Sequence, residues 1–183
     1  ALVWAPRVRR LLCRNGTSRA RPPPLLIPDL ARAAVLVTYI PEALAPALGR
    51  FWPGALTVIF RASPEVSWDL GDTGGTVALR MPAHDVALEL LRLVGPLAVS
   101  SANLTGQRPA QSVDEAIMQL GEGVGVYLDA GAVGHRFSGS PGSSGSTVID
   151  ASSVGAGGVG RVVRRGVVPI EALVSLLPGE WEG

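Results

Sequence analysis

Two polar segments that follow apolar runs carry the side chains best suited to chemistry. Arg80 ends the apolar run of residues 76–79, and the segment 100–103, Ser-Ser-Ala-Asn, follows the run of residues 97–99. A guanidinium binds a carboxylate or phosphate through parallel hydrogen bonds, and hydroxyl and carboxamide groups bind the same anions or a ribose without adding charge. Ligands of open α/β sheets lie beyond strand ends. We therefore expect both segments to form walls of one anion-binding pocket.

Two further groups fit the same chemistry. Gly145-Ser146-Thr147 lies between a Gly/Ser-rich loop and an apolar run, where hydroxyls and free amides can hold an anion. Arg164-Arg165-Gly166 ends the last such run, and Arg19 and Arg21 lie near the N-terminus. Several arginines around one pocket favour a polyphosphate, but they suit an RNA backbone equally well.

Each feature alone also has a purely structural explanation. The 100–103 segment fits a helix N-cap or an Asx-turn, a lone arginine is usually solvated, and glycine-rich loops are common. His84 is more typical of a helix-capping residue than of a base. Three acidic residues could contact magnesium, yet each also fits a turn: Asp69, Asp72 and Asp129. The chemistry therefore depends on whether the fold brings these groups together.

Composition narrows the classes of function. The chain has 183 residues, 47% of them hydrophobic, and a net charge of +1, which is typical of one globular domain. It contains no lysine, so a Walker-type phosphate loop and a lysine base are excluded. One cysteine and two histidines exclude a disulfide framework and the common zinc sites. No apolar run has membrane-spanning length, and we expect a cytoplasmic protein.

The elements that must position these groups alternate irregularly, which predicts one α/β or α+β domain with a twisted sheet. Apolar runs predict strands, and helical spacing with capping signals predicts helices; residues 31–39 fit either. Trp52, beside a Pro-Gly turn, is expected to be a buried aromatic plug. The expected strands are 25–27, 56–60, 76–79, 97–99, 124–128, 146–150 and 161–164, and the expected helices are 41–48, 83–94, 112–120 and 169–177.

Five motifs together resemble the YrdC/Sua5 family of threonylcarbamoyl-AMP synthases, in the family's order, over roughly residue 19 to the end. They are Phe51-Trp52-Pro53-Gly54-Ala55-Leu56-Thr57, Thr76-Val77-Ala78-Leu79-Arg80-Met81-Pro82, Pro96 through Ser101-Ala102-Asn103-Leu104-Thr105-Gly106, Gly145-Ser146-Thr147-Val148-Ile149-Asp150 and Val163-Arg164-Arg165-Gly166. The resemblance implies a YrdC-like twisted mixed sheet, flanked by helices, with a concave basic face.

The resemblance also implies an activity. L-threonine, bicarbonate and ATP, the last with Mg²⁺, would condense to threonylcarbamoyl-AMP and pyrophosphate, and the product would pass to the proteins that make t6A in tRNA. By motif position, ATP would contact Arg19, Thr76, Asn103, Ser112 and Arg164, threonine would contact Arg80, Ser101 and Ser146, and Arg19 and Arg80 would be catalytic. No protein ligand for a metal is implied.

The N-terminal part departs from the family pattern. The family's Pro-Thr-Asp/Glu-Thr-X-Tyr-Gly segment is not found, its Lys-X-Arg appears as Thr17-Ser18-Arg19, and Arg165 stands where proline is usual. We therefore expect residues 1–18 to be an atypical or truncated segment before a domain at 19–183. Two alternatives stay open: a catalytically impaired protein that binds tRNA or double-stranded RNA, and a carbamoyl-transfer domain.

Overall fold

A seven-stranded mixed sheet organises the part of the chain that the computed structural model describes, residues 22–66, 68, 71–104, 106–132, 145–177 and 181–182. The strand order is β4-β1-β3-β2-β5-β6-β7. The strands are β1 (Leu25–Leu26), β2 (Leu56–Arg61), β3 (Thr76–Arg80), β4 (Leu97–Ala98), β5 (Thr147–Asp150), β6 (Gly160–Arg164) and β7 (Trp181–Glu182). The pairs β1–β3, β2–β5 and β6–β7 are parallel, whereas β1–β4, β2–β3 and β5–β6 are antiparallel. The predicted mixed sheet is confirmed.

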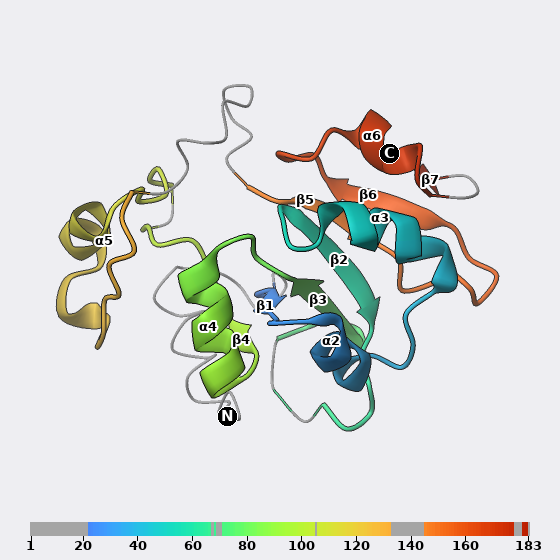
Figure 1. Ribbon diagram of the computed structural model, residues 1–183, viewed down its shortest axis with the longest axis horizontal. Helices are drawn as coiled ribbons and strands as arrows, with labels where there is room; N and C mark the ends of the chain where they lie inside the picture. Colours follow the sequence, from blue (N-terminus) through green and yellow to red (C-terminus); the bar gives the residue numbers. More distant parts are fainter. Residues whose placement is uncertain are drawn as a thin grey trace.

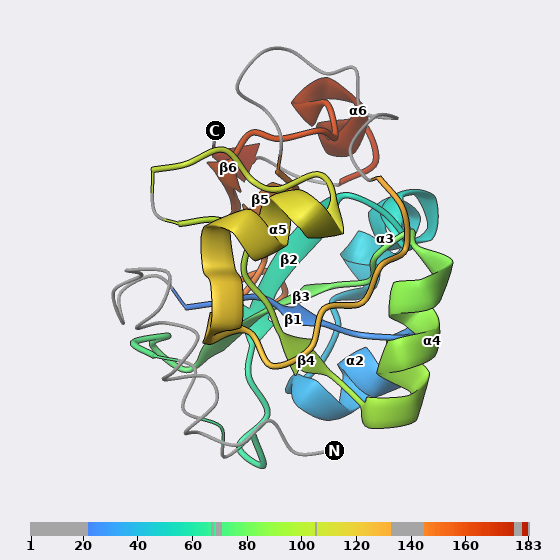
Figure 2. The same ribbon diagram turned by 90° about the vertical axis from the view of Figure 1, so that its left-hand side faces the viewer.

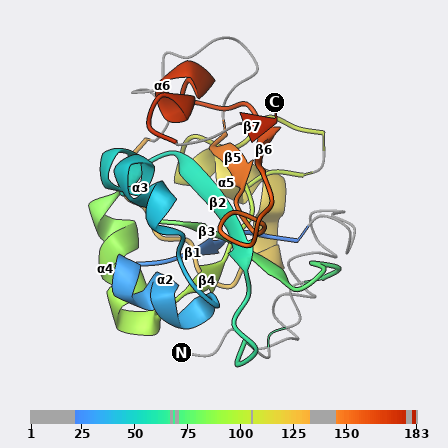
Figure 3. The same cartoon turned by 90° about the vertical axis from the view of Figure 1, so that its right-hand side faces the viewer.

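Helices α2, α3 and α4 form a layer on one face of this sheet (Figures 2 and 3). Helix α5 lies away from that layer, at the left of Figure 1. None of the helices in the described ranges is long and apolar enough to cross a membrane. The helices are α2 (Leu30–Leu36), η1 (Glu42–Leu44), α3 (Ala45–Phe51), α4 (Asp85–Val94), α5 (Val113–Leu120), η2 (Gly121–Gly123) and α6 (Ile170–Val174).

The alternation along β3 divides the sheet into a core face and an open face. Val77 and Leu79 are buried, whereas Thr76, Ala78 and Arg80 are partly exposed. Side chains paired across strands share a face, so the register places the remaining strands. The open face, defined by Thr76, Ala78 and Arg80, also carries Thr57, Ile59, Arg61, Val148, Asp150, Arg161 and Arg164.

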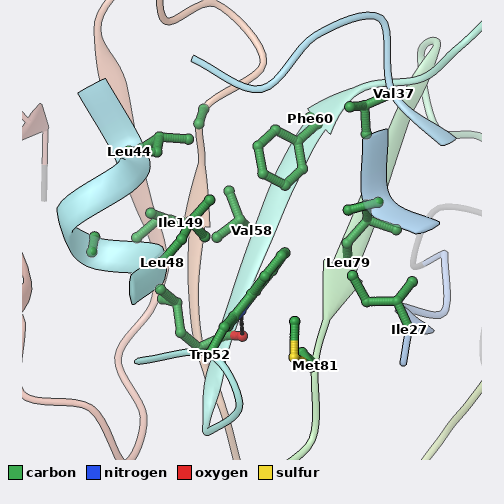
Figure 4. Close-up of a cluster of buried hydrophobic side chains, with 14 of the residues drawn as sticks. Ile27, Val37, Leu44, Leu48, Trp52, Val58, Phe60, Leu79, Met81 and Ile149 are labelled. Carbon is green, nitrogen blue, oxygen red and sulfur yellow. Dashed lines mark hydrogen bonds between the residues drawn. The ribbon is translucent and has the colours of Figure 1, made fainter. Parts of the chain in front are cut away.

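The core face packs against the helices through a continuous apolar cluster (Figure 4). Trp52 confirms its predicted role, because its side chain is only 6% exposed and its ring meets Phe60 edge-on with centroids 6.4 Å apart. The indole Nε1 donates a hydrogen bond of 2.8 Å to the Leu56 carbonyl oxygen. A buried aromatic with its polar atom satisfied can fix the turn that follows it. Trp52 thus anchors the Pro53-Gly54 turn at the start of β2.

Hydrogen bonds at the helix ends explain the helix boundaries better than the helix propensities of the residues do. The ambiguous residues 31–39 are helical up to Leu36, as part of α2, because the Asp29 carboxylate accepts from the Arg32 amide at 2.7 Å and caps the first turn. Helix α3 continues through Gly49, where we expected it to stop, because the Trp52 amide still donates to the Leu48 carbonyl at 2.9 Å. The capping prediction for His84 is confirmed, since its Nδ1 accepts from the Ala87 amide.

One predicted strand is absent. Residues 124–128 form no strand, and Val126 and Leu128 are 74% and 61% exposed. The segment instead returns beside α5, where the Tyr127 hydroxyl donates to the Gly121 carbonyl at 2.7 Å. An alternating apolar pattern needs a neighbouring strand to become a ladder, and this segment has none among the described residues.

Candidate functional site

Arg80 lies at the end of β3, where the Trp52–Ala55 turn meets the strand. Its Nε donates to the Gly54 carbonyl at 2.9 Å, and the Gly54 amide donates to the Met81 carbonyl at 2.8 Å. These two bonds tie the Arg80 side chain and the end of β3 to the turn. Gly54 is required at this point, because a Cβ there would lie 2.3 Å from the Phe51 carbonyl oxygen. The turn therefore positions the arginine.

Ser146 and Arg164 meet at the neighbouring strand ends. The Arg164 Nε and Nη2 atoms donate to the Ser146 carbonyl at 3.0 and 2.8 Å, and Nη2 also donates to the Ser146 hydroxyl at 2.9 Å. On its other side the Ser146 hydroxyl shares a 2.7 Å hydrogen bond with the hydroxyl of Thr57. Ser146 is only 7% exposed, so its hydroxyl is held in one place.

A close backbone contact holds these two motifs together. The Gly166 amide donates to the Thr147 hydroxyl at 3.1 Å, and that hydroxyl donates to the Val168 carbonyl at 2.7 Å. A Cβ on Gly166 would lie 2.5 Å from backbone atoms of residues 145–147, so only glycine fits. The Arg-X-Gly sequence thus lets β6 end against the start of β5, with Arg164 over Ser146.

The electrostatics of Arg80 and Arg164 point to an anion. Burial lowers the pKa of Arg80 below its ordinary value, and the nearby positive charge of Arg164 lowers it further. Burial also lowers the pKa of Arg164. Neither guanidinium forms an ion pair in the part of the chain that the structure describes, where the pairs are Arg108–Glu115 and Arg161–Asp150. Two adjacent, partly desolvated cations without a carboxylate favour a bound anion.

The second group of predicted residues surrounds a separate cavity of about 560 Å³ between α4, α5 and residues 124–131. Ser101 and Ser112 line it together with apolar side chains that include Val86, Leu90 and Ala116. This size and this mixture of a mostly apolar wall with a few polar groups are typical of small-molecule sites. Ser112 also caps α5, because its hydroxyl accepts from the Glu115 amide at 3.2 Å.

We expected Arg80 and residues 100–103 to form walls of one pocket, but the directions of their strands differ. β4 runs antiparallel to β1, and β1 runs parallel to β3. The chain therefore leaves β4 toward the edge at which β3 begins, near Thr76, rather than toward Arg80. Arg164 contacts Ser146, and its charge lies near Arg80, at one edge of the sheet. The other predicted residues, Ser101, Asn103 and Ser112, belong to the loop and helix beside the cavity.

Thr76 stands at the opposite end of β3 from Arg80. Its hydroxyl donates to the Thr73 carbonyl at 2.7 Å, which closes the turn before the strand. Thr76 also lines a groove of about 320 Å³ with Thr73 and Gly75. The hydroxyl oxygen still has acceptor capacity toward a ligand on the open face.

Asn103 shapes the loop and leaves one buried acceptor. Its Nδ2 donates to the carbonyls of Leu104 and Gln107 at 2.9 and 3.0 Å, which fixes the orientation of the amide. The Oδ1 atom is then buried and has no hydrogen-bond partner within the described residues. A buried acceptor without a donor costs free energy, and a ligand amino or hydroxyl group would satisfy it.

Sequence reasoning missed the residues on α5 that hold this loop. The Gln119 side chain accepts from the Leu104 amide at 3.1 Å and donates to the Arg108 carbonyl at 3.0 Å. One turn earlier, the Glu115 carboxylate accepts from the Gln111 amide at 2.9 Å. Gln111 is the residue directly before the Ser112 cap. Hydrogen bonds to loop backbone leave no pattern in a single sequence.

Replacing Gln119 by Ala is expected to loosen the loop without unfolding α5. Loss of the hydrogen bond to the Leu104 amide should speed hydrogen exchange of that amide by about five- to tenfold, since such a bond contributes about 1 kcal/mol. The measurement is amide exchange followed by NMR. Met118→Ala is the matched control, because Met118 is 79% exposed on the same helix. Equal exchange at Leu104 in both variants would contradict this role.

Among the described residues, no cluster of three or more histidine, cysteine or acidic side chains could hold a metal ion.

Comparisons with known proteins identify the family of the chain. The family model Sua5_yciO_yrdC, described as telomere recombination, matches residues 5–166. The chain is 42% identical over 170 residues to a Mycobacterium tuberculosis protein named "Putative threonylcarbamoyl-AMP synthase", covering 93% of this chain and 73% of that protein. It is 33% identical over 129 residues to the threonylcarbamoyl-AMP synthase of Bacillus subtilis, covering 69% of this chain and 37% of that protein.

Solved structures show the same fold. The Sua5 of Pyrococcus abyssi complexed with L-threonine matches with a TM-score of 0.81 at 29% identity, covering 94% of this chain and 48% of that one. The chain thus spans about half of the solved Sua5 chain. Escherichia coli YciO matches with a TM-score of 0.70 at 20% identity, over 92% of this chain and 77% of that one. The family expected from the five motifs is confirmed: the chain belongs to the Sua5/YciO/YrdC family and is related to threonylcarbamoyl-AMP synthases.

Proposed function

We propose that this chain condenses L-threonine, bicarbonate and ATP to L-threonylcarbamoyl-AMP with release of pyrophosphate, for the t6A modification of tRNA. The observation that carries the proposal is the pair of guanidiniums of Arg80 and Arg164 beside the Ser146 hydroxyl, without a carboxylate partner in the described residues. All three substrates carry anionic groups. A site that concentrates fixed positive charge beside a hydroxyl donor suits them.

Threonine is proposed to bind at the edge formed by β3, β5 and β6. The Nη groups of Arg80, which make no hydrogen bond within the described residues, would bind its carboxylate, and the Ser146 hydroxyl would add one hydrogen bond. Ser101, also proposed for threonine, lines the neighbouring cavity. A related Sua5 was solved with L-threonine, which supports this substrate for the shared fold.

ATP is proposed to occupy the cavity beside α5 and to extend its phosphates along the open face. Ser112 lines that cavity, and the buried Asn103 Oδ1 would accept from an amino or hydroxyl group of the nucleotide. Thr76 would add its hydroxyl on the open face. The phosphates would reach Arg164 and also Arg19, which lies outside the described residues. Magnesium is proposed to enter bound to these phosphates.

The protein groups would act by position and charge. Holding the carbamate of threonine against the α-phosphate converts an encounter of two dilute molecules into a reaction within one complex. The threonine amine forms a C–N bond to bicarbonate with loss of water, which gives the carbamate. The carbamate oxygen attacks the α-phosphorus, and pyrophosphate leaves with the electrons of the broken phosphoanhydride bond. Arg164, Arg19 and Arg80 would stabilise the negative charge that develops on the phosphoryl oxygens.

The second candidate is RNA binding with little or no catalysis. It rests on six arginines that precede the first acidic residue, Asp29, and on the missing lysine of the Lys-X-Arg motif. Arginine-rich segments bind phosphate backbones in a salt-dependent manner.

One assay separates the two candidates. Purified protein is incubated with ATP, magnesium and bicarbonate, with and without L-threonine, and pyrophosphate is measured. Release that depends on threonine is the expected result. No release, together with tRNA binding that weakens as salt rises, would replace the synthase by the RNA-binding protein.

A further inference from the structure

Thr57 lies under the candidate site and has no role in the assignment above. It is on the open face of β2 and pairs with Val148 of β5, two residues beyond Ser146, so the Thr57 and Ser146 side chains share a face. Its side chain is 2% exposed, and its hydroxyl makes one hydrogen bond, of 2.7 Å, to the Ser146 hydroxyl. A hydroxyl in an otherwise apolar strand interior therefore contacts a residue proposed to bind substrate.

The direction of this hydrogen bond follows from a count of donors and acceptors. A hydroxyl donates one proton and accepts two hydrogen bonds. The Ser146 oxygen already accepts from Nη2 of Arg164 at 2.9 Å. If Ser146 donated to Thr57, the Thr57 proton would be buried without an acceptor, because Thr57 has no other hydrogen-bond partner among the described residues. If Thr57 donates, its proton is satisfied and the Ser146 oxygen has both acceptor positions filled.

We propose that Thr57 is a positioning residue: it donates to the Ser146 hydroxyl and, with Arg164, leaves the Ser146 proton as the one group of that side chain free to donate to a bound anion. This inference rests on the proposed function, and it names how one hydroxyl is oriented toward the threonine carboxylate or its carbamate. Without Thr57, the Ser146 hydroxyl would rotate among several orientations, and binding the anion would require it to select one.

Three variants of Thr57 test the inference. Thr57→Val keeps the shape of the side chain and removes the hydroxyl. Thr57→Ser and Thr57→Ala both lack the methyl group and differ only in the hydroxyl, so their comparison holds even if one substitution affects folding. Thermal unfolding of each variant controls for stability. The readouts are KM for L-threonine and kcat in the pyrophosphate assay, with each change repeated in a Ser146→Ala background.

The expected result is a KM for threonine raised about tenfold in Thr57→Val and Thr57→Ala, with kcat changed less than about threefold and near wild-type values in Thr57→Ser. In the Ser146→Ala background, removing the Thr57 hydroxyl should have no further effect, because Thr57 acts through Ser146. Unchanged KM in Thr57→Val, or effects that add in the double variants, would overturn the inference alone. A wild-type protein that releases no pyrophosphate with threonine would instead overturn the proposed function and, with it, the ligand toward which Ser146 is oriented.

Discussion

Replacing Arg80 by Met should lower threonine-dependent pyrophosphate release by about 100-fold or more and leave the fold as stable as before. The guanidinium is proposed to make at least two charge-assisted hydrogen bonds to the substrate, each of which contributes about 1.5–3 kcal/mol. In the free protein the same group is partly desolvated, and its pKa is lowered by burial and by the charge of Arg164. A partly desolvated charge with a perturbed pKa is typical of functional sites.

The measurement is kcat/KM for threonine together with the thermal unfolding midpoint. Arg50→Met is the matched control, because Arg50 is exposed at the end of α3 and contacts the Phe51 ring at 5.5 Å. Arg80→Met with activity within threefold of the wild type would show that this guanidinium does not bind the substrate. A large fall in the unfolding midpoint would show that its main role is structural.

Gly166→Ala should destabilise the protein and abolish most activity. A Cβ at this position would lie 2.5 Å from Gly145 O, Ser146 C and Thr147 N, which are backbone atoms that cannot rotate away. Overpacking of this kind costs about 1–3 kcal/mol, which lowers the unfolding midpoint by about 2–4 °C per kcal/mol in a domain of this size. Because the displaced backbone carries Ser146, threonine-dependent turnover should fall at least about tenfold.

Gly49→Ala provides a control with the opposite sign. Gly49 lies inside α3, and a Cβ there would meet nothing within 4 Å. Alanine in a helix interior is more stable than glycine by about 0.5–1 kcal/mol, so the midpoint should rise while activity is unchanged. If Gly166→Ala unfolds at the wild-type temperature, the close approach of Gly166 to the backbone of residues 145–147 does not contribute to the stability of the protein.

The sequence predicted most strongly those features that local patterns encode. The apolar run of residues 76–79 identified β3 and its terminal Arg80, and helical spacing with capping signals identified α4 and α5 within the expected ranges 83–94 and 112–120. The candidate residues Ser146 and Arg164 were found by their places beside glycines at strand ends. In the structure, Arg164 donates a hydrogen bond to the Ser146 hydroxyl. Neither motif predicts this contact on its own.

Local sequence patterns could not predict the direction of the short strands or the strands with which they pair. β1 and β4 have two residues each, and their register depends on neighbours far away in the sequence. The sequence therefore could not show that residues 100–103 leave the sheet at the edge opposite Arg80. Thr57 and Gln119 were missed for a related reason, because their roles consist of single hydrogen bonds to groups distant in sequence or within a loop.

The most direct test of the proposed function is detection of the product itself. The protein is incubated with ATP, magnesium, L-threonine and ¹³C-labelled bicarbonate, and the mixture is analysed by mass spectrometry. The account predicts threonylcarbamoyl-AMP that carries one ¹³C atom, forms only when threonine is present, and is lost in Arg80→Met but not in Arg50→Met. ATP consumption without that labelled product, or its equal formation by Arg80→Met, would contradict it.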